Sequence, residues 1–465
     1  MISTLLFANA ILLSGTTEIT VYNQGLGFVK EIRMLHLKKG LQSALVEDVA
    51  QMIDATSVGF KCLNNPGSIS VLEQNYRYDL ISPQAILEKS VGKRVRFTRS
   101  MGNTKESIQG TLLSSPTAVV SKDGQSEFSY NGLVIRADDG RIILSPEGEI
   151  DVLEIPEGLI SKPTLVWELD SDKEQDAKME LSYLTGGMNW TANYVFTLDS
   201  SSSGDIQGWV TLDNQSGFSF KDATLKLLSG DVNVVRDQSL NYLISGYVAA
   251  TGDKMRVKPM SEESLFEYHL YTLNRSASMR NKEQKQLNLL EGSGVPYKKQ
   301  ISIESSTGEA ETGNGDLDAK VKIKFTNDQK SHLGMPMPAG KFRLYQRDSK
   351  GSLQFIGEDT VNHTPRDEKV SLTVGKAFDI KATHKRTVYT VLSKNTSRSK
   401  YEVEIRNRKQ EAQTVFYYAH LMNAQWKMSE NSDPYVKDDS STAVFEVKLQ
   451  PGEVKTVSFQ VDYKW

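Results

Sequence analysis

Six histidines are the residues of this 465-residue chain best suited to proton transfer or metal binding: His36, His269, His332, His363, His384 and His420. None of them pairs with another at the spacing of a metal-binding helix, and no H-E-x-x-H or G-x-S-x-G sequence occurs. For a lone strand or turn histidine such as His269 or His363, a hydrogen-bonded structural role is the expected one. We predict no catalytic residue from local sequence, and a site assembled from distant positions stays open.

Acidic residues alternate at Asp170, Asp172, Glu174 and Asp176, as they do in some calcium loops. The run lacks the central glycine and the terminal bidentate glutamate of an EF-hand, so it predicts a solvated loop. Cys62 is the single cysteine, which excludes an intrachain disulfide and a zinc site made of cysteines. It is expected to be a small buried hydrophobe. The sequence predicts no metal ligands.

Phosphate-binding loops are absent, because neither G-x-x-x-x-G-K-[ST] nor G-x-G-x-x-G between a strand and a helix occurs. The one short glycine motif, Gly25-Leu26-Gly27, lies between two predicted strands and indicates a hairpin. We therefore expect no nucleotide or other cofactor.

The charge balance argues against nucleic acid as a partner. The net charge is −3 and the pI is near 6.2, so no overall basic field exists to neutralise phosphates. The C-terminal region does collect cations that could bind an anionic polymer. The interspersed Glu402, Glu404 and Glu411 favour instead a solvated, self-neutralising sheet face. The cations are Lys376, Lys381, Lys385, Arg386, Lys394, Arg398, Lys400, Arg406, Arg408 and Lys409.

The stretch 179–198 carries the densest apolar alternation of the chain. Met179, Leu181 and Tyr183 alternate with polar residues before a glycine pair, and Trp190 lies in the alternating run after it. Period-two alternation predicts strands with one buried face. Gly186-Gly187 predicts the turn of a hairpin at the centre of a β-sheet core.

A short helix and a small barrel are expected further upstream. Ser82 as N-cap and Pro83 as first residue predict a helix that ends before Gly92. Residues 91–156 contain strands, a glycine bend and an Asp-Gly hairpin turn, the pattern of an SH3-like or Sm-like barrel. Some such barrels bind RNA, but eight Lys/Arg face nine Asp/Glu in this stretch. The balance predicts a structural module.

The chain is too long for one core and predicts a mostly β, multi-domain protein of tandem β-sandwiches with few short helices. The expected division is 1–16 as a candidate signal peptide, 17–90 as an N-terminal β region and 91–156 as the small barrel. A central β-sandwich domain spans 157–375, with an irregular insertion at about 238–318 in which 249–262 and 302–317 are surface loops. An immunoglobulin-like sandwich fills 376–465.

The first fifteen residues are apolar, with small residues suited to cleavage but no basic start. They predict an export signal, and hence a periplasmic or secreted protein. An ordinary first β-strand, and with it a cytoplasmic protein, is the alternative. No other segment approaches the ~20 apolar residues of a membrane span.

Several blocks together resemble a bacterial family, domain of unknown function 4139, distantly related to mucoidy-inhibitor proteins. The matching stretches are 21–26, 71–84, 181–194, 229–233, 266–273 and 355–359, and the resemblance covers about residues 17–465. It implies a mostly β, often exported protein, and it implies no activity, cofactor or catalytic residue. Mucoidy-inhibitor relatives carry a long coiled-coil insertion, for which this sequence has no heptad pattern.

These observations favour a non-enzymatic envelope or secreted protein that binds a protein or a cell-surface glycan through its β-domains. An envelope-polymer hydrolase with a site assembled from distant residues is one alternative, and a cytoplasmic scaffold is another. The sequence does not determine the oligomeric state.

Overall fold

The computed structural model of the protein describes residues 7–13, 15–101, 104–114, 117–122, 125–130, 132–144, 148–154, 156–199, 202–233, 260–307, 315–421 and 425–464. Within them the chain is mostly β-strand, with one α-helix and one short 3-10 helix, η1 (Ala55–Ser57). This confirms the mostly β, multi-sheet fold predicted from the sequence. No helix in this part of the chain is long and apolar enough to cross a membrane.

The chain forms two compact units that do not follow the predicted linear order of domains. Unit 1 consists of Met1–Met188, Asn214–Leu225 and Ser276–Glu283, and unit 2 of Asn189–Asp213, Lys226–Arg275 and Gln284–Trp465. The chain therefore enters unit 2 three times. Local sequence patterns do not show such an exchange, because it depends on which distant strands pair.

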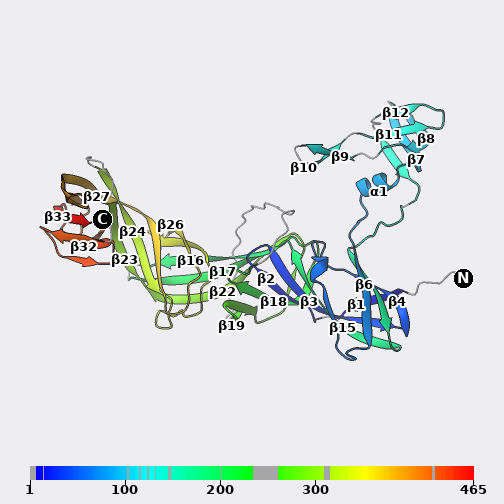
Figure 1. The fold of residues 1–465 in the computed structure, drawn as a ribbon, viewed down its shortest axis with the longest axis horizontal. Helices are drawn as coiled ribbons and strands as arrows, with labels where there is room; N and C mark the ends of the chain where they lie inside the picture. The colour runs from blue at the N-terminus through cyan, green and yellow to red at the C-terminus, as the bar shows by residue number, and fades with distance from the viewer. Residues whose placement is uncertain are drawn as a thin grey trace. The chain divides into compact units, whose positions relative to one another are not determined.

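Unit 1 contains a sheet ordered β18-β2-β3-β1-β4-β14-β6, in which β15 pairs with both β3 and β5 (Figure 1). The strands are β1 (Phe7–Leu12), β2 (Glu18–Tyr22), β3 (Leu26–Leu37), β4 (Gly40–Glu47), β5 (Gly59–Cys62), β6 (Ile69–Arg77), β14 (Thr164–Ser171), β15 (Gln175–Gly186) and β18 (Phe220–Ser229), whose last residues belong to unit 2; β21 (Ala277–Met279) pairs with β18.

Part of the predicted signal segment lies in this sheet. Phe7–Leu12 form β1, which runs antiparallel to β3 and parallel to β4. The stretch thus has the conformation of the alternative interpretation, an ordinary first strand. Residues 1–6 and 14 lie outside the described residues, and export stays a prediction.

The predicted hairpin at 179–198 is the clearest correction. Both strands exist with the expected burial, and Tyr183 and Trp190 are buried. They do not pair, however: β15 joins β3 and β5, whereas β16 (Met188–Leu198) joins β17 and β25 in another sheet. Gly187 has a φ of 73°, and the chain leaves unit 1 directly after Met188. The glycine therefore redirects the chain instead of closing a hairpin.

The helix and the small module follow the sequence pattern closely. Helix α1 (Pro83–Lys89) begins at Ser82, whose side chain accepts a hydrogen bond from the Ala85 amide. A five-stranded antiparallel sheet ordered β12-β11-β8-β7-β13 follows, with its own apolar core around Phe97, Leu112 and Ile135. Its strands are β7 (Arg94–Met101), β8 (Thr104–Leu112), β11 (Val134–Ala137), β12 (Ile142–Leu144) and β13 (Glu149–Val152), beside a separate pair β9 (Thr117–Lys122) and β10 (Gln125–Tyr130).

Unit 2 contains a five-stranded sheet ordered β22-β17-β16-β25-β26, together with a short meander of β19, β20 and the end of β18. Residues 283–296 form one long strand, and 268–273 form another that begins after a turn. The bounds are β17 (Ser203–Asn214), β19 (Met260–Leu265), β20 (Tyr268–Leu273), β22 (Glu283–Pro296), β25 (Gly340–Arg347) and β26 (Leu353–Val361).

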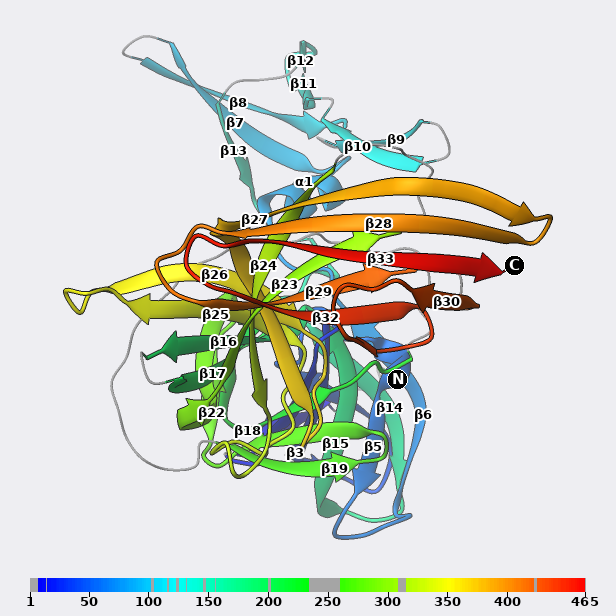
Figure 2. The same ribbon diagram turned by 90° about the vertical axis from the view of Figure 1, so that its left-hand side faces the viewer.

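A nine-stranded sheet completes unit 2, in the order β30-β33-β28-β27-β24-β23-β29-β32-β31 (Figure 2). One core unites its strands, with Tyr401, Tyr417, Phe445 and Phe459 at the centre. The strands are β23 (Lys298–Ser306), β24 (Gly315–Thr326), β27 (Lys369–Ser393), β28 (Thr396–Asn407), β29 (Gln413–His420), β30 (Trp426–Ser429), β31 (Tyr435–Lys437), β32 (Thr442–Leu449) and β33 (Val454–Lys464).

This sheet differs from the immunoglobulin-like sandwich expected at 376–465. The predicted boundary falls inside β27, and β23 and β24 separate β27 from β29. The predicted loop 302–317 is largely strand where the structure describes it, and residue 260 begins β19. Residues 249–259 and 308–314, the rest of the two predicted loops, lie outside the described residues. Pairing across about a hundred residues, not local polarity, sets these strands.

Candidate functional site

The histidines form hydrogen bonds or ring contacts within their own units. His36 contacts Asp176 of the acidic run at 2.8 Å on an exposed surface, and His269 contacts Glu262 at 2.7 Å. His384 stacks on Tyr401. Among the described residues, no three His, Cys, Asp or Glu side chains are grouped so as to hold a metal ion.

Ser229 and His363 form the pair that comes nearest to a hydrolytic site. The Ser229 hydroxyl lies 3.0 Å from Nδ1 of His363, which also accepts a hydrogen bond from the Ala339 amide. The single lone pair of Nδ1 is thus shared between two donors, which weakens it as a general base. Ser229 is also buried. The pair fastens the end of β18 to the 336–340 segment and is poorly placed for nucleophilic attack.

A surface hollow of about 460 Å³ lies at the turns that end β16 and β25, lined by Thr197, Leu198, Asp199, Gly204, Asp205, Gln346, Arg347, Asp348 and Ser349. Three of these residues carry carboxylates, the groups that glycosidases use. Asp199 and Asp205 accept hydrogen bonds from nearby serines, and Asp348 from the Gln354 side chain and the Ser352 amide. These bonds lower the pKa of Asp348, whereas a general acid needs a raised pKa. The three aspartates of the hollow thus accept hydrogen bonds from nearby side chains and backbone amides.

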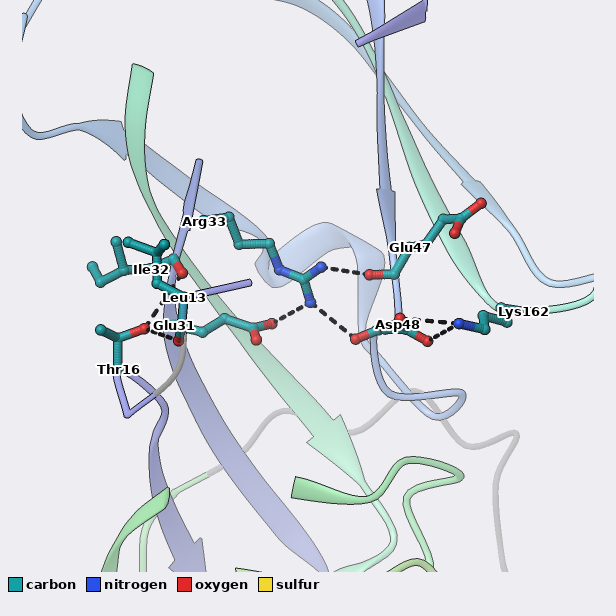
Figure 3. A network of polar contacts seen from close by, with 8 residues as sticks. All are labelled: Leu13, Thr16, Glu31, Ile32, Arg33, Glu47, Asp48 and Lys162. Atoms are coloured by element: carbon teal, nitrogen blue, oxygen red, sulfur yellow. Dashed lines mark hydrogen bonds and ion pairs between the residues drawn. The ribbon is translucent and has the colours of Figure 1, made fainter. Parts of the chain in front are cut away.

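Glu31 and Arg33 form a buried ion pair in unit 1 that the sequence analysis did not predict (Figure 3). Nη2 of Arg33 is 3.1 Å from Glu31, and the guanidinium also donates to the carbonyls of Glu47 and Asp48. Asp48 pairs with exposed Lys162 at the edge of the network. Burial raises the pKa of Glu31, against the opposing charge of Arg33. Both Nη atoms of Arg33 are engaged within the chain, whereas its Nε and Oε2 of Glu31 have no hydrogen-bond partner among the described residues. The contacts indicate a role in fixing β3 against the end of β4.

The predicted cations of the C-terminal region divide into two sets. Those on β28 are neutralised, as Arg398 is by a bidentate contact with Asp462 at 2.6 and 2.8 Å. On β27, Lys381 lies over the ring of Phe378 and Arg386 over that of Tyr389. Lys381, Lys385 and Lys394 form no ion pair with any described residue. The prediction that these cations are neutralised by neighbouring acids therefore fits β28 better than β27.

The far half of β27 also exposes apolar side chains. Val388, Tyr389, Val391 and Leu392 are 42%, 52%, 65% and 48% exposed, and they lie beyond His384, the last residue that pairs with β24. Figure 2 shows β27 and β28 side by side as a long hairpin, with β33 next to β28. We name residues 385–400 the β27–β28 tip. It combines cations, the ring of Tyr389 and aliphatic groups on one hairpin.

Sequence reasoning missed the apolar part of this tip. It weighed only the cations of this region. A signal was present, because Val388-Tyr389-Thr390-Val391-Leu392 places apolar pairs in succession instead of alternating them. Such a run makes both faces of a strand apolar, which suits a buried strand or one awaiting a partner.

The small module at 91–156 balances its charges internally. Arg94 pairs with Asp138, Arg99 with Glu106 and Arg141 with Asp139. These three arginines are engaged with neighbouring carboxylates, and the role of the module as a structural one stays a prediction.

Three groups of side chains bear on function: the β27–β28 tip, the Ser229–His363 pair and the acidic hollow. The β27–β28 tip exposes apolar and cationic side chains. Nδ1 of His363 is shared between Ser229 and the Ala339 amide, and Asp348 of the hollow has a lowered pKa. No protein-family model matches the chain, and the search of curated proteins finds no similar sequence.

Proposed function

We propose that this chain is a non-enzymatic binding protein of the cell envelope or of the secreted space, which holds a protein or glycan partner through its β-domains. The observation that carries the proposal is the β27–β28 tip. Exposed aliphatic and aromatic groups next to cations form the mixture that binding surfaces use, with apolar contacts for affinity and charges for orientation.

Burial of the tip explains why a partner would bind. Covering a half-exposed valine, leucine or tyrosine removes apolar surface from water at roughly 25 cal/mol per Å². Tyrosine and arginine are enriched among residues that dominate binding energy. Arg386 lies 4.8 Å from the centre of the Tyr389 ring, so the tip already holds such a pair in place.

The proposal is tested with the full-length protein and an isolated envelope fraction. Saturable sedimentation of the protein with that fraction is expected, and a Tyr389→Ser, Val391→Ser double variant should bind at least about tenfold more weakly, since tenfold corresponds to 1.4 kcal/mol. Val436→Ser is the matched control. This valine is 72% exposed on β31, an edge strand of the same sheet that four strands separate from β27, so its loss should leave binding unchanged.

Two results would overturn the proposal at different levels. If the double variant binds as the wild type does, the contact surface lies elsewhere. If neither envelope protein extract nor purified cell-wall polysaccharide binds the wild type, the binding function itself is wrong. Near-ultraviolet circular dichroism of each variant confirms that the sheet is intact.

A further inference from the structure

Lysines gather on one face of three neighbouring strands in the nine-stranded sheet. β24 lies between β23 and β27, and its even-numbered residues in 320–324 are lysines on the side away from the buried residues of the strand. Lys298 of β23 is the cross-strand partner of Lys324, so it lies on the same face. Lys369 of β27 does so too, because it is the partner of Thr326. We name these five residues the β24 lysine face: Lys298, Lys320, Lys322, Lys324 and Lys369.

The β24 lysine face holds like charges at close range. Lys298 and Lys324 are directly opposite on antiparallel strands, where Cβ atoms are ~4.5–5.5 Å apart and like charges destabilise the sheet. Burial and the charge of Lys322 lower the pKa of Lys324. Asp438 opposes this shift, and Lys369 adds to it. A bound anion would relieve the repulsion between these ammonium groups.

One carboxylate on this face offsets part of the charge. Glu304 accepts hydrogen bonds from Lys320 over 3.2 Å and from Lys322 over 2.9 Å. The same face carries five lysines against this one acid in residues 298–304, 320–326 and 369–373. The face therefore has an excess of positive charge, which attracts anions.

The lysines have polar, uncharged neighbours. Gln300 is the cross-strand partner of Lys322, and its Nε2 donates to the Tyr418 hydroxyl over 2.9 Å. Nζ of Lys322 lies 5.9 Å from the centre of the Tyr418 ring. Ser371 is the partner of Lys324 on β27. Hydroxyl and amide groups beside cations suit a ligand that carries hydroxyls as well as negative charges, and an aromatic ring can cover the apolar face of a sugar.

A peptide suits this surface less well than a sugar does. β24 is paired with β23 on one side and with β27 on the other, so its backbone groups are engaged in the sheet and cannot receive an added strand. Of the exposed large apolar side chains in the described part of the chain, none lies on β23, β24 or β29. The surface thus offers a peptide neither a backbone ladder nor apolar contacts.

We infer that the β24 lysine face binds a linear polysaccharide that carries carboxylates. The carboxylates contact Lys298, Lys324 and Lys369, and the sugar hydroxyls contact Gln300 and Ser371. This site shares no residue with the β27–β28 tip. It is a second binding site with a different ligand chemistry, and it does not rest on the function proposed for the tip.

The test uses the full-length protein and fluorescent polygalacturonate, a linear chain with a carboxylate on each sugar. Saturable binding that weakens as salt rises is expected. A Lys298→Gln, Lys324→Gln double variant should bind at least about tenfold more weakly. The matched control is Lys38→Gln, Lys39→Gln, which removes the same two charges from exposed residues between β3 and β4 of unit 1. It should bind as the wild type does.

Thermal unfolding without polysaccharide tests the repulsion separately and shows whether the double variant folds. The variant should unfold at a higher temperature than the wild type, because it removes two like charges that lie opposite each other. A lower unfolding temperature would contradict the repulsion argument.

The contrary results of the binding test are also specific. No saturable binding of polygalacturonate by the wild type, or equal binding by the double variant, overturns the inference. Equal binding of neutral galactan overturns the charge argument. Competition by polyglutamate at the same carboxylate concentration, or by inorganic phosphate at the same concentration, would assign the face to acidic peptides or to small anions and overturn the polysaccharide. Each result leaves the tip proposal intact, because that proposal is tested through Tyr389 and Val391.

Discussion

Nδ2 of Asn407 donates a hydrogen bond to the carbonyl oxygen of Gln450 over 3.0 Å, which ties the end of β28 to the turn after β32. The same amide donates to Glu411, and its Oδ1 accepts from the Lys409 amide. Asn407 is fully buried. One side chain therefore satisfies several backbone groups where two strands end.

The arrangement occurs twice more. Asn214 ends β17 and donates to the carbonyls of Phe218 and Arg280 within unit 1, and Asn327 follows β24 and donates to those of Met335 and Pro365. Each asparagine is the last residue of the same five-residue pattern, in which the first and third residues are apolar. The pattern occurs at residues 210–214, 323–327 and 403–407. The repeated pattern marks a strand end whose backbone groups need a buried donor.

Replacing Asn407 with alanine should lower the free energy of unfolding by at least about 2 kcal/mol, because each carbonyl left without a donor costs ~1–3 kcal/mol. Urea unfolding measures the loss. Asn395→Ala, in the exposed turn between β27 and β28, is the control and should change stability by less than about 0.5 kcal/mol. Equal effects of the two changes would show that the Asn407 bonds are dispensable.

Arg33→Met should destabilise unit 1 by roughly 3–5 kcal/mol, because it leaves the Glu31 carboxylate buried without its counter-charge. Lys30→Met on the same strand removes only exposed ion pairs and should cost under about 1 kcal/mol.

The Arg33 effect should depend on pH in a stated direction. Burial raises the pKa of Glu31, so the folded state binds its proton more tightly than the unfolded state, and this group's contribution falls as pH rises above its unfolded value. The deficit of Arg33→Met should therefore shrink towards acid pH, where a neutral Glu31 needs no partner. A constant deficit across pH would contradict the assignment.

Trp190→Ala should cost roughly 3–5 kcal/mol, since the ring is 2% exposed and its removal leaves a cavity. Trp190→Phe separates the ring from the polar contact, because it keeps an aromatic group but loses the bond from Nε1 to the Leu228 carbonyl. Chemical denaturation should place this variant between the wild type and the alanine variant. A loss under about 1 kcal/mol for alanine would mean that the ring is not in the core.

Gly187→Ala should be more destabilising than Gly25→Ala, although both glycines have a positive φ, of 73° and 77°. A Cβ at Gly25 meets open space, so only the backbone penalty of ~1–2 kcal/mol applies. At Gly187 it would lie 2.8 Å from the Gln215 carbonyl and from the sulfur of Met52. Thermal unfolding of the two variants compares them, and equal shifts would contradict the close approach.

His384 gives a second pH dependence, in unit 2. Burial, and then the charge of Arg386, lower its pKa, so the unfolded state binds its proton more readily than the folded state. Stability should fall as pH drops below the unfolded value of about 6.5. His384→Phe keeps a ring beside Tyr401 and should remove this part of the decline, as urea titrations at pH 7 and 5.5 would show. An unchanged decline would assign it to other groups.

The sequence by itself determined the local elements, because their causes are local. The cap at Ser82, the turn at Asp138-Asp139-Gly140 and the inward side of Tyr183 and Trp190 all follow from residue type and period. The alternation near Glu31 and Arg33 was visible in the sequence too, but the sequence did not show which of the two alternating sets of side chains is buried. Val29, Leu35 and Leu37 are also buried on that face of β3, and they carry the ion pair inside with them.

Only the tertiary structure decided which strands pair. β15 and β16 are joined by one glycine yet belong to different sheets, and β23 pairs with β29 across more than a hundred residues. β27 likewise pairs with β24 along its first part and with β28 along its second. Strand pairing is a property of two segments at once. The pattern within one segment therefore fixes its faces but not its neighbours.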